Sequence, residues 1–313
     1  MARFLVTGGC GFIGSHLVDR LLAERAQVVV LDDLSTGRKE NLAPGAKLII
    51  GDIRDRNSVR DALTGVDGCF HLAAIASVEK AREAWSNTHA VNLAGTVAIF
   101  DAARLASNRG PVPVVYASSA AVYGNPGDDW EGRISEEAPT VPLSAYGADK
   151  LGCELHGRVA WTVHGVPTVG FRFFNVYGPR QDPASPYSGV ISIFANRVAT
   201  GAPIRINGDG EQLRDFVFVG DVVSRLTAAM SAMEPGARIF NVCTGQATSV
   251  KDLATRLETV FGRSVERIHG PARIGDIRIS IGDPARGDAA FGPCVTSLAD
   301  GLARTKAWLI EEK

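Results

Sequence analysis

The chain of 313 residues is long enough to bury one large core together with a smaller second lobe. Its 33 basic and 34 acidic residues nearly cancel, so no broad positive field is available to hold a nucleic acid or an anionic membrane surface. The five cysteines show no CxxC spacing, which argues against a disulfide framework and a zinc site. No apolar run reaches the roughly 18 residues of a membrane helix. We therefore expect a cytoplasmic protein without a metal.

Strands and helices alternate through the first half of the chain. Apolar runs of strand length are separated by segments of helical periodicity, which is typical of a parallel sheet covered by helices. The expected strands are 3–7, 27–32, 47–50, 68–73, 112–119 and 166–174, and the clearest helices are 11–24 and 145–163. The predicted fold class is α/β, with a Rossmann-type doubly wound parallel sheet and a smaller α/β C-terminal lobe that binds substrate.

Beyond residue 176 the chain contains loops rich in Pro and Gly. Helices are predicted at 189–200, 220–233, 249–261 and 297–311. The runs "DFVFV" (215–219) and "RIFNVC" (238–243) are typical of strands, and we expect both to rejoin the main sheet. We therefore assign 1–175 to the first domain, rejoined by 216–242, and assign 176–215 and 243–313 to the substrate lobe.

Three glycines stand between the first expected strand and the first expected helix. In "VTGGCGFIGSHL", Gly8, Gly11 and Gly14 permit a tight turn and a close approach of backbone to a pyrophosphate at the helix N-terminus. Asp32 ends the second expected strand, where a carboxylate can accept both ribose hydroxyls of NAD. The neighbouring Asp33 would repel a 2′-phosphate, so the pattern favours NAD over NADP.

A further acidic residue follows the third expected strand. Asp52 in "IIGDIRD" is a candidate ligand for the adenine amino group of the cofactor. The alternative is that Asp52 caps the helix that contains "NSVRDAL".

A tyrosine, a lysine and two serines form the candidate catalytic group. Tyr146 and Lys150 stand four residues apart in "SAYGADKLGCE", on one face of a predicted helix, and Ser118 and Ser119 end a predicted strand. An ordinary tyrosine titrates near pH 10 and is a poor base at neutral pH, but a neighbouring ammonium favours the phenolate. The strand end lies at the carboxyl edge where open α/β sheets bind ligands.

With these residues the chain resembles the extended short-chain dehydrogenase/reductases, and within them the nucleotide-sugar 4-epimerases. The resemblance rests on "TGGCGFIGSHLV", "LDDLSTGRKENL", "FHLAA", "VNLAGT", "SSAAVYG", "YGADK", "FRFFNVYGPRQDP", "GDGEQLRDFVFVGDV" and "RIGDIRIS". It implies a tightly bound NAD that oxidises a sugar at C4, a 4-keto intermediate that turns over, and hydride return to the opposite face. It also implies a homodimer formed through the helices at about 85–107 and 145–163.

The resemblance assigns roles to individual residues. Tyr146 would remove the 4-hydroxyl proton, Lys150 would hold the nicotinamide ribose, Ser119 would bond the 4-oxygen, and Ser118 would support the nicotinamide. The cofactor residues implied are Gly8, Gly11, Phe12, Ile13, Gly14, Asp32, Asp52, Ile53, Leu72, Ala73, Ala74, Asn92, Ser118, Tyr146 and Lys150. The substrate residues implied are Ser77, Ser119, Asn175, Arg214, Arg273 and Ser280.

Ala120 and Ala121 follow the serines and limit the chemistry. Related enzymes that eliminate water carry Asp-Glu at these positions, and uronate decarboxylases carry Glu at the second, because their reactions need another proton shuttle. Two alanines leave a site that moves a hydride and one proton at C4, which is what epimerisation requires.

Two positions bear on the choice of sugar. Ser280 falls where glucose-restricted epimerases have a bulky tyrosine, so it leaves room for an acetamido group and favours UDP-GlcNAc and UDP-GalNAc, with UDP-glucose and UDP-galactose also possible. Asp182 falls where uronate 4-epimerases place an arginine, so it disfavours a UDP-glucuronate 4-epimerase. Besides the UDP-glucuronate 4-epimerase, which stays an alternative, two further functions stay open at this point. One is a nucleotide-sugar reductase or dehydrogenase with exchanging cofactor, and the second is a non-catalytic NAD-sensing or scaffold protein.

Overall fold

The chain folds into two compact units, each assembled from several segments. The computed structural model describes residues 1–106, 110–125, 127, 132–184, 188–272 and 276–311. The first unit contains Met1–Val122, Pro142–Arg172 and Val223–Phe240, and the second contains Tyr123–Val141, Phe173–Val222 and Asn241–Lys313. Each unit therefore depends on contacts between segments that are far apart in the sequence.

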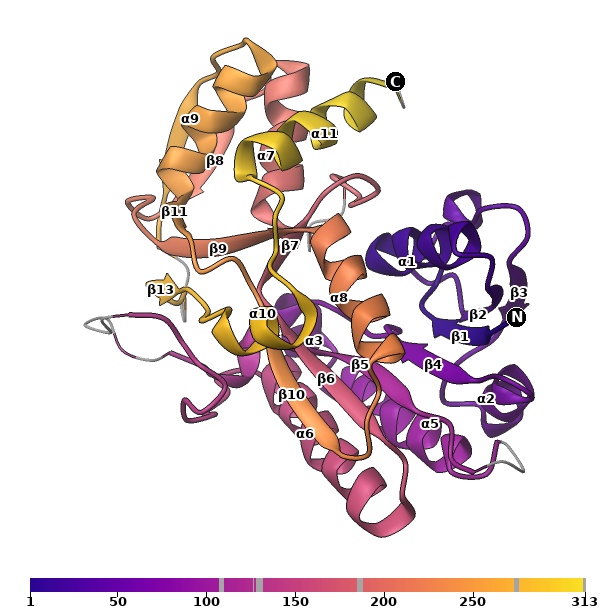
Figure 1. Cartoon of the computed structure of the whole chain (residues 1–313). Coiled ribbons are helices and arrows are strands. Elements are labelled where there is room, and N and C mark those ends of the chain that lie inside the picture. Colours follow the sequence, from indigo (N-terminus) through magenta and orange to yellow (C-terminus); the bar gives the residue numbers. More distant parts are fainter. Residues whose placement is uncertain (107–109, 126, 128–131, 185–187, 273–275, 312–313) are drawn as a thin grey trace. The chain divides into compact units, whose positions relative to one another are not determined.

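A seven-stranded sheet in the order β10-β6-β5-β4-β1-β2-β3 forms the centre of the first unit (Figure 1). The pairs β1–β2, β1–β4, β2–β3 and β4–β5 run parallel. The strand order reverses between β1 and β4, and in such sheets ligands bind outside the carboxyl ends of the strands at this point. The strands are β1 (Arg3–Thr7), β2 (Gln27–Asp32), β3 (Lys47–Ile50), β4 (Gly68–His71), β5 (Val114–Ser119), β6 (Thr168–Phe173) and β10 (Ala237–Val242).

Helices cover both faces of this sheet. Helices α2, α5 and α6 lie on one face and α1 and α8 on the other (Figure 1). The core on the α2–α5–α6 side includes Leu31, Ile99 and Tyr116, all at most 1% exposed. Because both faces are covered, the strands are continuous apolar runs, as the sequence indicates. The helices are α1 (Phe12–Ala23), α2 (Arg56–Leu63), α3 (Val78–Glu83), α4 (Trp85–His89), α5 (Gly95–Ala103), α6 (Ala145–His164) and α8 (Val219–Ser231), with short 3-10 turns at Lys39–Asn41 and Ala120–Val122 and a π-helical turn at Ala90–Ala94.

The second unit is a smaller α/β structure. Strand β9 pairs with β11, β13 and β7, and β8 pairs with β12 in a separate two-stranded sheet. Helices α7, α9 and α11 pack against one another. The elements are β7 (Asn175–Tyr177), α7 (Val190–Thr200), β8 (Ile204–Asn207), β9 (Leu213–Phe218), β11 (Ala247–Ser249), α9 (Val250–Phe261), β12 (Arg267–Gly270), β13 (Ile279–Ser280), α10 (Ala285–Phe291) and α11 (Leu298–Glu311).

The predicted fold class is confirmed, with one strand placed wrongly. Strand β10 joins the main sheet beside β6, as expected, but the run at 215–219 does not. Its residues belong mainly to β9, which pairs with β11 in antiparallel register and with β13 and β7 in parallel. An apolar strand surrounded by three short partners has the same sequence pattern as a central strand of the main sheet, so the pattern alone could not separate the two.

Candidate active site

The turn between β1 and α1 forms a cradle that side chains would fill. Gly8 has φ +69°, a left-handed conformation that favours glycine, and a Cβ on Gly14 would lie 2.1 Å from the carbonyl oxygen of Gly8. Gly11 is the N-cap residue of α1 and has no side chain to bond the first N–H groups of the helix, whose first turn begins with Phe12 and Ile13. The N–H groups at this helix start and the positive end of the helix fit a pyrophosphate.

The carboxylate of Asp32 lies against this turn. Its oxygens accept the backbone N–H groups of Cys10 and Leu34, each at 2.9 Å, and the residue is 6% exposed. Burial raises the pKa of Asp32, and the two N–H bonds oppose that shift. A carboxylate has four lone-pair directions, so two remain for the ribose hydroxyls.

Asp52 and Ile53 follow β3 as expected but differ in environment. The Asp52 carboxylate forms an ion pair with the Arg54 guanidinium, which lowers the pKa of Asp52. The cap of α2 is Asp55, whose carboxylate accepts the N–H groups of Asn57 and Ser58, so the capping role considered for Asp52 is wrong. The Ile53 side chain is buried, and a Cβ on Gly95 would lie 2.6 Å from its Cδ1.

Leu72, Ala73 and Ala74 leave the sheet where the strand order reverses. The hydroxyl oxygen of Thr7, at the end of β1, accepts the N–H groups of Leu72 and Ala73, each at 3.2 Å. A Cβ on Gly8 would lie 2.8 Å from the Ala73 nitrogen, so this segment is in contact with the glycine turn. The cofactor residues expected from these two segments therefore lie together.

Asn92 stands in the π-helical turn at Ala90–Ala94. Its amide accepts the N–H of Ile75 at 2.8 Å and donates to the carbonyl of Ile75 at 3.1 Å. The side chain therefore holds the segment that follows β4, and π-helical turns are frequent at functional sites. The hydroxyl of Ser77, a little further along, accepts the N–H of Lys80 and caps α3.

Helix α6 brings Tyr146 and Lys150 to the end of β5. Ser144 caps the helix by accepting the N–H of Gly147. The Lys150 ammonium donates to the carbonyl of Ala117 at 2.7 Å and lies 5.9 Å from the centre of the Tyr146 ring. The ammonium therefore lies beside the ring of the candidate base.

Ser119 and the two alanines form a turn that packs against α6. The hydroxyl of Ser119 accepts the N–H of Ala121 at 3.1 Å. A Cβ on Gly147 would lie 2.5 Å from the Ala121 carbonyl oxygen, so only glycine permits this contact between the helix and the turn. The structure thereby brings Ser119, Tyr146 and Lys150 to the same edge of the sheet.

A buried ion pair beside this group was not predicted from the sequence. The Ser118 hydroxyl donates to Glu154 at 2.5 Å, and the Arg172 guanidinium donates to the same carboxylate from β6. Both signals are present in the sequence. Glu154 follows Lys150 by four residues, and Arg172 is the one charged residue in the strand "TVGFRF".

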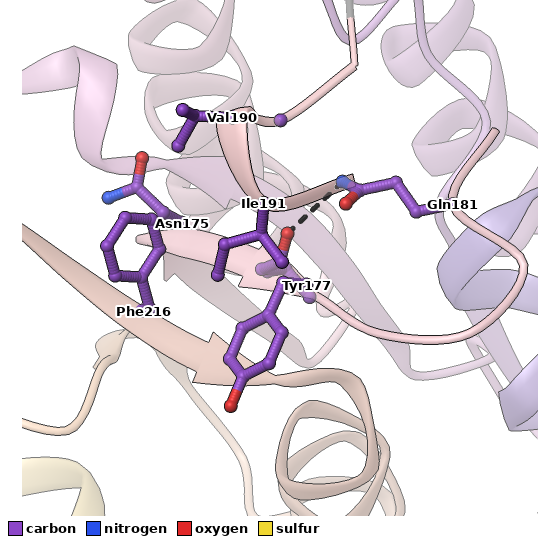
Figure 2. A pocket seen from close by; sticks show the side chains of 8 residues that line it. Asn175, Tyr177, Gln181, Val190, Ile191 and Phe216 are labelled. Carbon is purple, nitrogen blue, oxygen red and sulfur yellow. Dashed lines mark hydrogen bonds between the residues drawn. The ribbon is translucent and has the colours of Figure 1, made fainter. Parts of the chain in front are cut away.

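Part of the second unit forms a pocket, shown in Figure 2. The Asn175 amide donates to the Asp215 carbonyl at 3.0 Å, and the Gln181 amide donates to the Val176 carbonyl at 3.2 Å. The buried Oε1 of Gln181 has no hydrogen-bond partner among the described residues. The pocket is lined by Asn175, Val176, Tyr177, Gln181, Gly189, Val190, Ile191 and Phe216.

Arg214 and Ser280 are neighbours on β9 and β13. They are directly paired in the register of the two strands. The Arg214 guanidinium donates to the Asp276 carboxylate at 2.6 Å, so the group expected to bind phosphate is paired with an acidic side chain of its own unit. Arg273 lies outside the described residues.

Metal clusters and membrane helices are both absent from the described part of the chain. There, no three His, Cys, Asp or Glu side chains are placed to hold a metal ion. In the same residues no helix is long and apolar enough to cross a bilayer.

Known proteins resemble the chain over its whole length. A UDP-glucose 4-epimerase of Mycolicibacterium smegmatis is 40% identical over 312 residues, which cover 97% of each chain. The structure of a UDP-glucose 4-epimerase from Thermotoga maritima with UDP-glucose has a TM-score of 0.93 at 33% identity and covers 99% of each chain. A UDP-N-acetylglucosamine 4-epimerase from Methanobrevibacter ruminantium, in complex with UDP-N-acetylmuramic acid, has a TM-score of 0.91 at 32% identity and covers 100% of this chain and 99% of its own.

The family model described as the NAD dependent epimerase/dehydratase family matches residues 4–243. This match contains the glycine turn, Asp32, the two serines, Tyr146 and Lys150, and it confirms the resemblance and the NAD cofactor inferred from the sequence. The chain belongs to the NAD dependent epimerase/dehydratase family.

Proposed function

We propose that the chain is an isomerase that inverts C4 of a UDP-sugar through a transient 4-keto intermediate. The observation that carries this proposal is the arrangement of Tyr146 and Lys150 over the end of β5, next to the turn that contains Ser119, Ala120 and Ala121. The turn supplies one hydroxyl and no further acid. The three relatives named above support the same reaction type. Two of them are UDP-glucose 4-epimerases and the third is a UDP-N-acetylglucosamine 4-epimerase.

Each catalytic side chain has a separate task in this proposal. The Tyr146 phenolate removes the proton of the 4-hydroxyl and returns it after inversion, while the Lys150 ammonium stabilises the negative charge on the phenolate. The Ser119 hydroxyl donates to the 4-oxygen and holds it within reach of Tyr146. Bound NAD supplies the chemistry of hydride acceptance and return. The 4-keto sugar rotates in the site before the hydride returns, so that the hydride reaches the opposite face of C4.

The glycine turn and the residues around it are proposed to bind the cofactor. Gly8, Gly11 and Gly14 leave space for the pyrophosphate, and the carboxylate of Asp32 accepts ribose hydroxyls. Ser118, whose hydroxyl donates to Glu154, is proposed to support the nicotinamide from the end of β5. The acidic Asp33 beside Asp32 disfavours a 2′-phosphate on that ribose. Asp52, Ile53, Leu72, Ala73, Ala74 and Asn92 complete the proposed cofactor site.

For the substrate we propose UDP-GlcNAc and UDP-GalNAc, with activity on UDP-glucose and UDP-galactose. The small side chain of Ser280 lies beside Arg214. A sugar nucleotide whose phosphate binds Arg214 would therefore contact a serine at this position, where glucose-restricted epimerases have a bulky tyrosine. Arg214 and Arg273 are proposed to bind the diphosphate, with Asn175 and Ser77 near the sugar. Asp182 would repel a uronate carboxylate, which disfavours the UDP-glucuronate 4-epimerase.

A reductase or dehydrogenase with exchanging cofactor would use the same serine, tyrosine and lysine. Such an enzyme consumes or releases one reduced cofactor for each product formed. An epimerase returns its hydride and therefore needs no added NAD once the cofactor is bound.

We also propose that the protein forms a homodimer through α6 and α4. Leu155, Val159 and Val163 follow one another at intervals of four residues on α6 and are 59%, 44% and 67% exposed. Trp85 on α4, which packs against α6, is 68% exposed. An apolar stripe of this kind matches an isologous helix-to-helix contact with a second copy.

The five free thiols support a reducing compartment such as the cytoplasm.

A panel of UDP-sugars tests the proposed function. The purified protein is incubated, without added cofactor, with UDP-GlcNAc, UDP-GalNAc, UDP-glucose, UDP-galactose and UDP-glucuronate, and the products are separated by chromatography. We expect the two acetylated sugars to interconvert, the two plain hexoses to interconvert, and UDP-glucuronate to remain. Conversion that stops unless NAD or NADH is supplied in stoichiometric amount would contradict the proposal and favour a reductase or dehydrogenase.

A further inference from the structure

One face of α6 carries three ionisable groups at intervals of one turn. Tyr146, Lys150 and Glu154 are each four residues apart. A lysine and a glutamate in this relation attract each other on a helix surface. A Lys150–Glu154 pair would draw the ammonium along the helix, away from the phenol. In the structure the ammonium instead donates to the carbonyl of Ala117 and remains near the Tyr146 ring.

The Glu154 carboxylate is occupied by other partners. Its Oε1 accepts the Ser118 hydroxyl at 2.5 Å and Nε of Arg172 at 2.9 Å, and its Oε2 accepts NH2 of Arg172 at 2.7 Å. The Glu154 and Arg172 side chains are only 6% and 7% exposed. A fork-to-fork pair in such a place is strong and geometrically fixed.

We propose that Arg172 is a positioning residue for the catalytic pair. It neutralises Glu154 so that Lys150 stays with Tyr146, and through Glu154 it fixes Ser118, the residue immediately before Ser119. The inference rests on the proposed role of Tyr146 as the base. Arg172 itself lies on β6 and acts through Glu154 and Lys150.

The other titratable groups around these side chains include one further carboxylate, that of the buried Asp149. His71 on β4 faces Lys150, and burial lowers the pKa of His71 to about 3, so it is neutral. His89 on α4 bonds the carboxylate of Asp149. The groups that face the stripe are His71 from β4, His89 from α4, Tyr116 from β5, Asp149 and Cys153 from α6 and Arg172 from β6.

Buried ion pairs are a poor source of net stability, because desolvation offsets most of the attraction. A glutamate and an arginine are therefore a costly way to join α6, β5 and β6 if the join is their whole purpose. Two apolar residues of similar volume would hold the elements as well. The charge and the bond to Ser118 are the features that apolar residues cannot reproduce.

The test is a titration of the Tyr146 phenolate in Arg172→Met. Ultraviolet absorbance is followed against pH in the protein without substrate, and the signal of the same variant carrying Tyr146→Phe is subtracted. We expect the midpoint to rise by about one pH unit, since Lys150 is drawn to the unpaired Glu154. The acidic limb of kcat should move in the same direction, with kcat near neutral pH about tenfold lower and KM for the UDP-sugar unchanged.

Two further variants separate positioning from structural support. In Glu154→Gln/Arg172→Met the anion is absent, so the midpoint should return close to that of the parent even if the melting temperature does not. Arg267→Met breaks the Arg267–Glu258 pair of the second unit and should lower stability without moving the midpoint. If Arg172→Met lowers only stability and leaves the midpoint and kcat unchanged, the inference is wrong.

If Arg172→Met does not fold, Ser118→Ala is the variant used for the same titration. It removes one of the three bonds to Glu154 and leaves the buried ion pair intact, so a smaller shift of the same sign is expected, and no shift would overturn the inference. The phenolate titration needs no substrate. A failure to epimerise any UDP-sugar would therefore count against the proposed function alone, while an unmoved midpoint would count against the role of Arg172 alone.

Discussion

At the scale of single residues, Tyr146 carries most of the proposed chemistry. Its ring lies 5.9 Å from the Lys150 ammonium, whose position is fixed by the Ala117 carbonyl. Tyr146→Phe removes the base and keeps the ring, so we expect folding and NAD retention to persist while kcat falls at least about 10²-fold. Circular dichroism and the NAD content of the purified protein serve as controls. Turnover close to that of the parent would exclude Tyr146 as the base.

Ser280 carries the proposal on substrate choice. If it borders the substituent at C2, Ser280→Tyr should fill the acetamido space and lower kcat/KM for UDP-GlcNAc and UDP-GalNAc by roughly ten- to a hundred-fold relative to UDP-glucose and UDP-galactose. Ser280→Ala keeps a small side chain and is the matched control. An equal loss on acetylated and plain sugars would show that Ser280 has a structural role.

His71 predicts a pH dependence of stability. Its Nδ1 lies 2.7 Å from the Thr7 hydroxyl and its Nε2 lies 2.9 Å from the Thr96 hydroxyl, and burial lowers its pKa from 6.5 to about 3. The unfolded chain therefore binds a proton at a pH where the folded chain does not. Stability that is present above pH 6.5 should be lost as the pH falls toward 3, by up to about 1.4 kcal/mol per pH unit.

The measurement is denaturant unfolding between about pH 7 and pH 5, for the parent and for His71→Gln. The variant is expected to be less stable overall but to lose less stability on acidification. An identical slope of unfolding free energy against pH in both proteins would contradict this prediction. It would mean that the pKa of His71 is the same in the folded and the unfolded chain.

The site residues that the sequence predicts differ in kind from the features that it does not predict. Gly8, Gly11, Gly14, Tyr146 and Lys150 have spacings set by local geometry, a turn or one helix face. The Glu154–Arg172 pair joins a helix to a strand that follows it, and the choice of Asp55 over Asp52 as a cap depends on where α2 begins. Neither is fixed by spacing along the chain.

At the scale of elements, the contact between α6 and the turn after β5 aligns the proposed catalytic groups. A Cβ on Gly147 would meet the Ala121 carbonyl oxygen at 2.5 Å, and a backbone atom cannot move aside as a flexible side chain can. Gly147→Ala should therefore shift the start of α6 and reduce kcat by about tenfold or more, although alanine has the better helix propensity.

Gly152→Ala in the same helix is the control for this prediction. Its Cβ would meet only the methyl ends of Leu93, at 3.0 Å, which can adjust. Steady-state kinetics of the two variants make the comparison. Equal kcat values in Gly147→Ala and the parent would show that the close approach of helix and turn does not set the catalytic geometry.

Most elements were predictable because strands buried on both faces are apolar throughout and helices have a clear period. The exceptions have physical reasons. Strand β9 has the same apolar pattern as a sheet-centre strand, and its partners β7, β11 and β13 are only two or three residues long. The π-helical turn at Ala90–Ala94 is one residue wider than an α-helical turn, and periodicity over so short a stretch does not reveal it.

At the scale of the whole molecule, the two units are interleaved along the chain. The segment Tyr123–Val141, which the sequence pattern places in the first domain, belongs by its contacts to the second unit. Within that unit the Glu136 carboxylate accepts the N–H of Asn241, and Ile134 bridges to Gly282. Such pairings link residues more than a hundred positions apart, and no composition change marks them.

The claim at the centre of this account is that the hydrogen removed from C4 returns to C4 within one bound turnover. The direct measurement is epimerisation of UDP-GlcNAc in D₂O without added cofactor, with the product examined by NMR for deuterium at C4. We expect conversion to UDP-GalNAc with protium retained at C4, because Tyr146 exchanges only the hydroxyl proton with solvent. Deuterium at C4, or conversion matched by an equal amount of released reduced cofactor, would contradict the account.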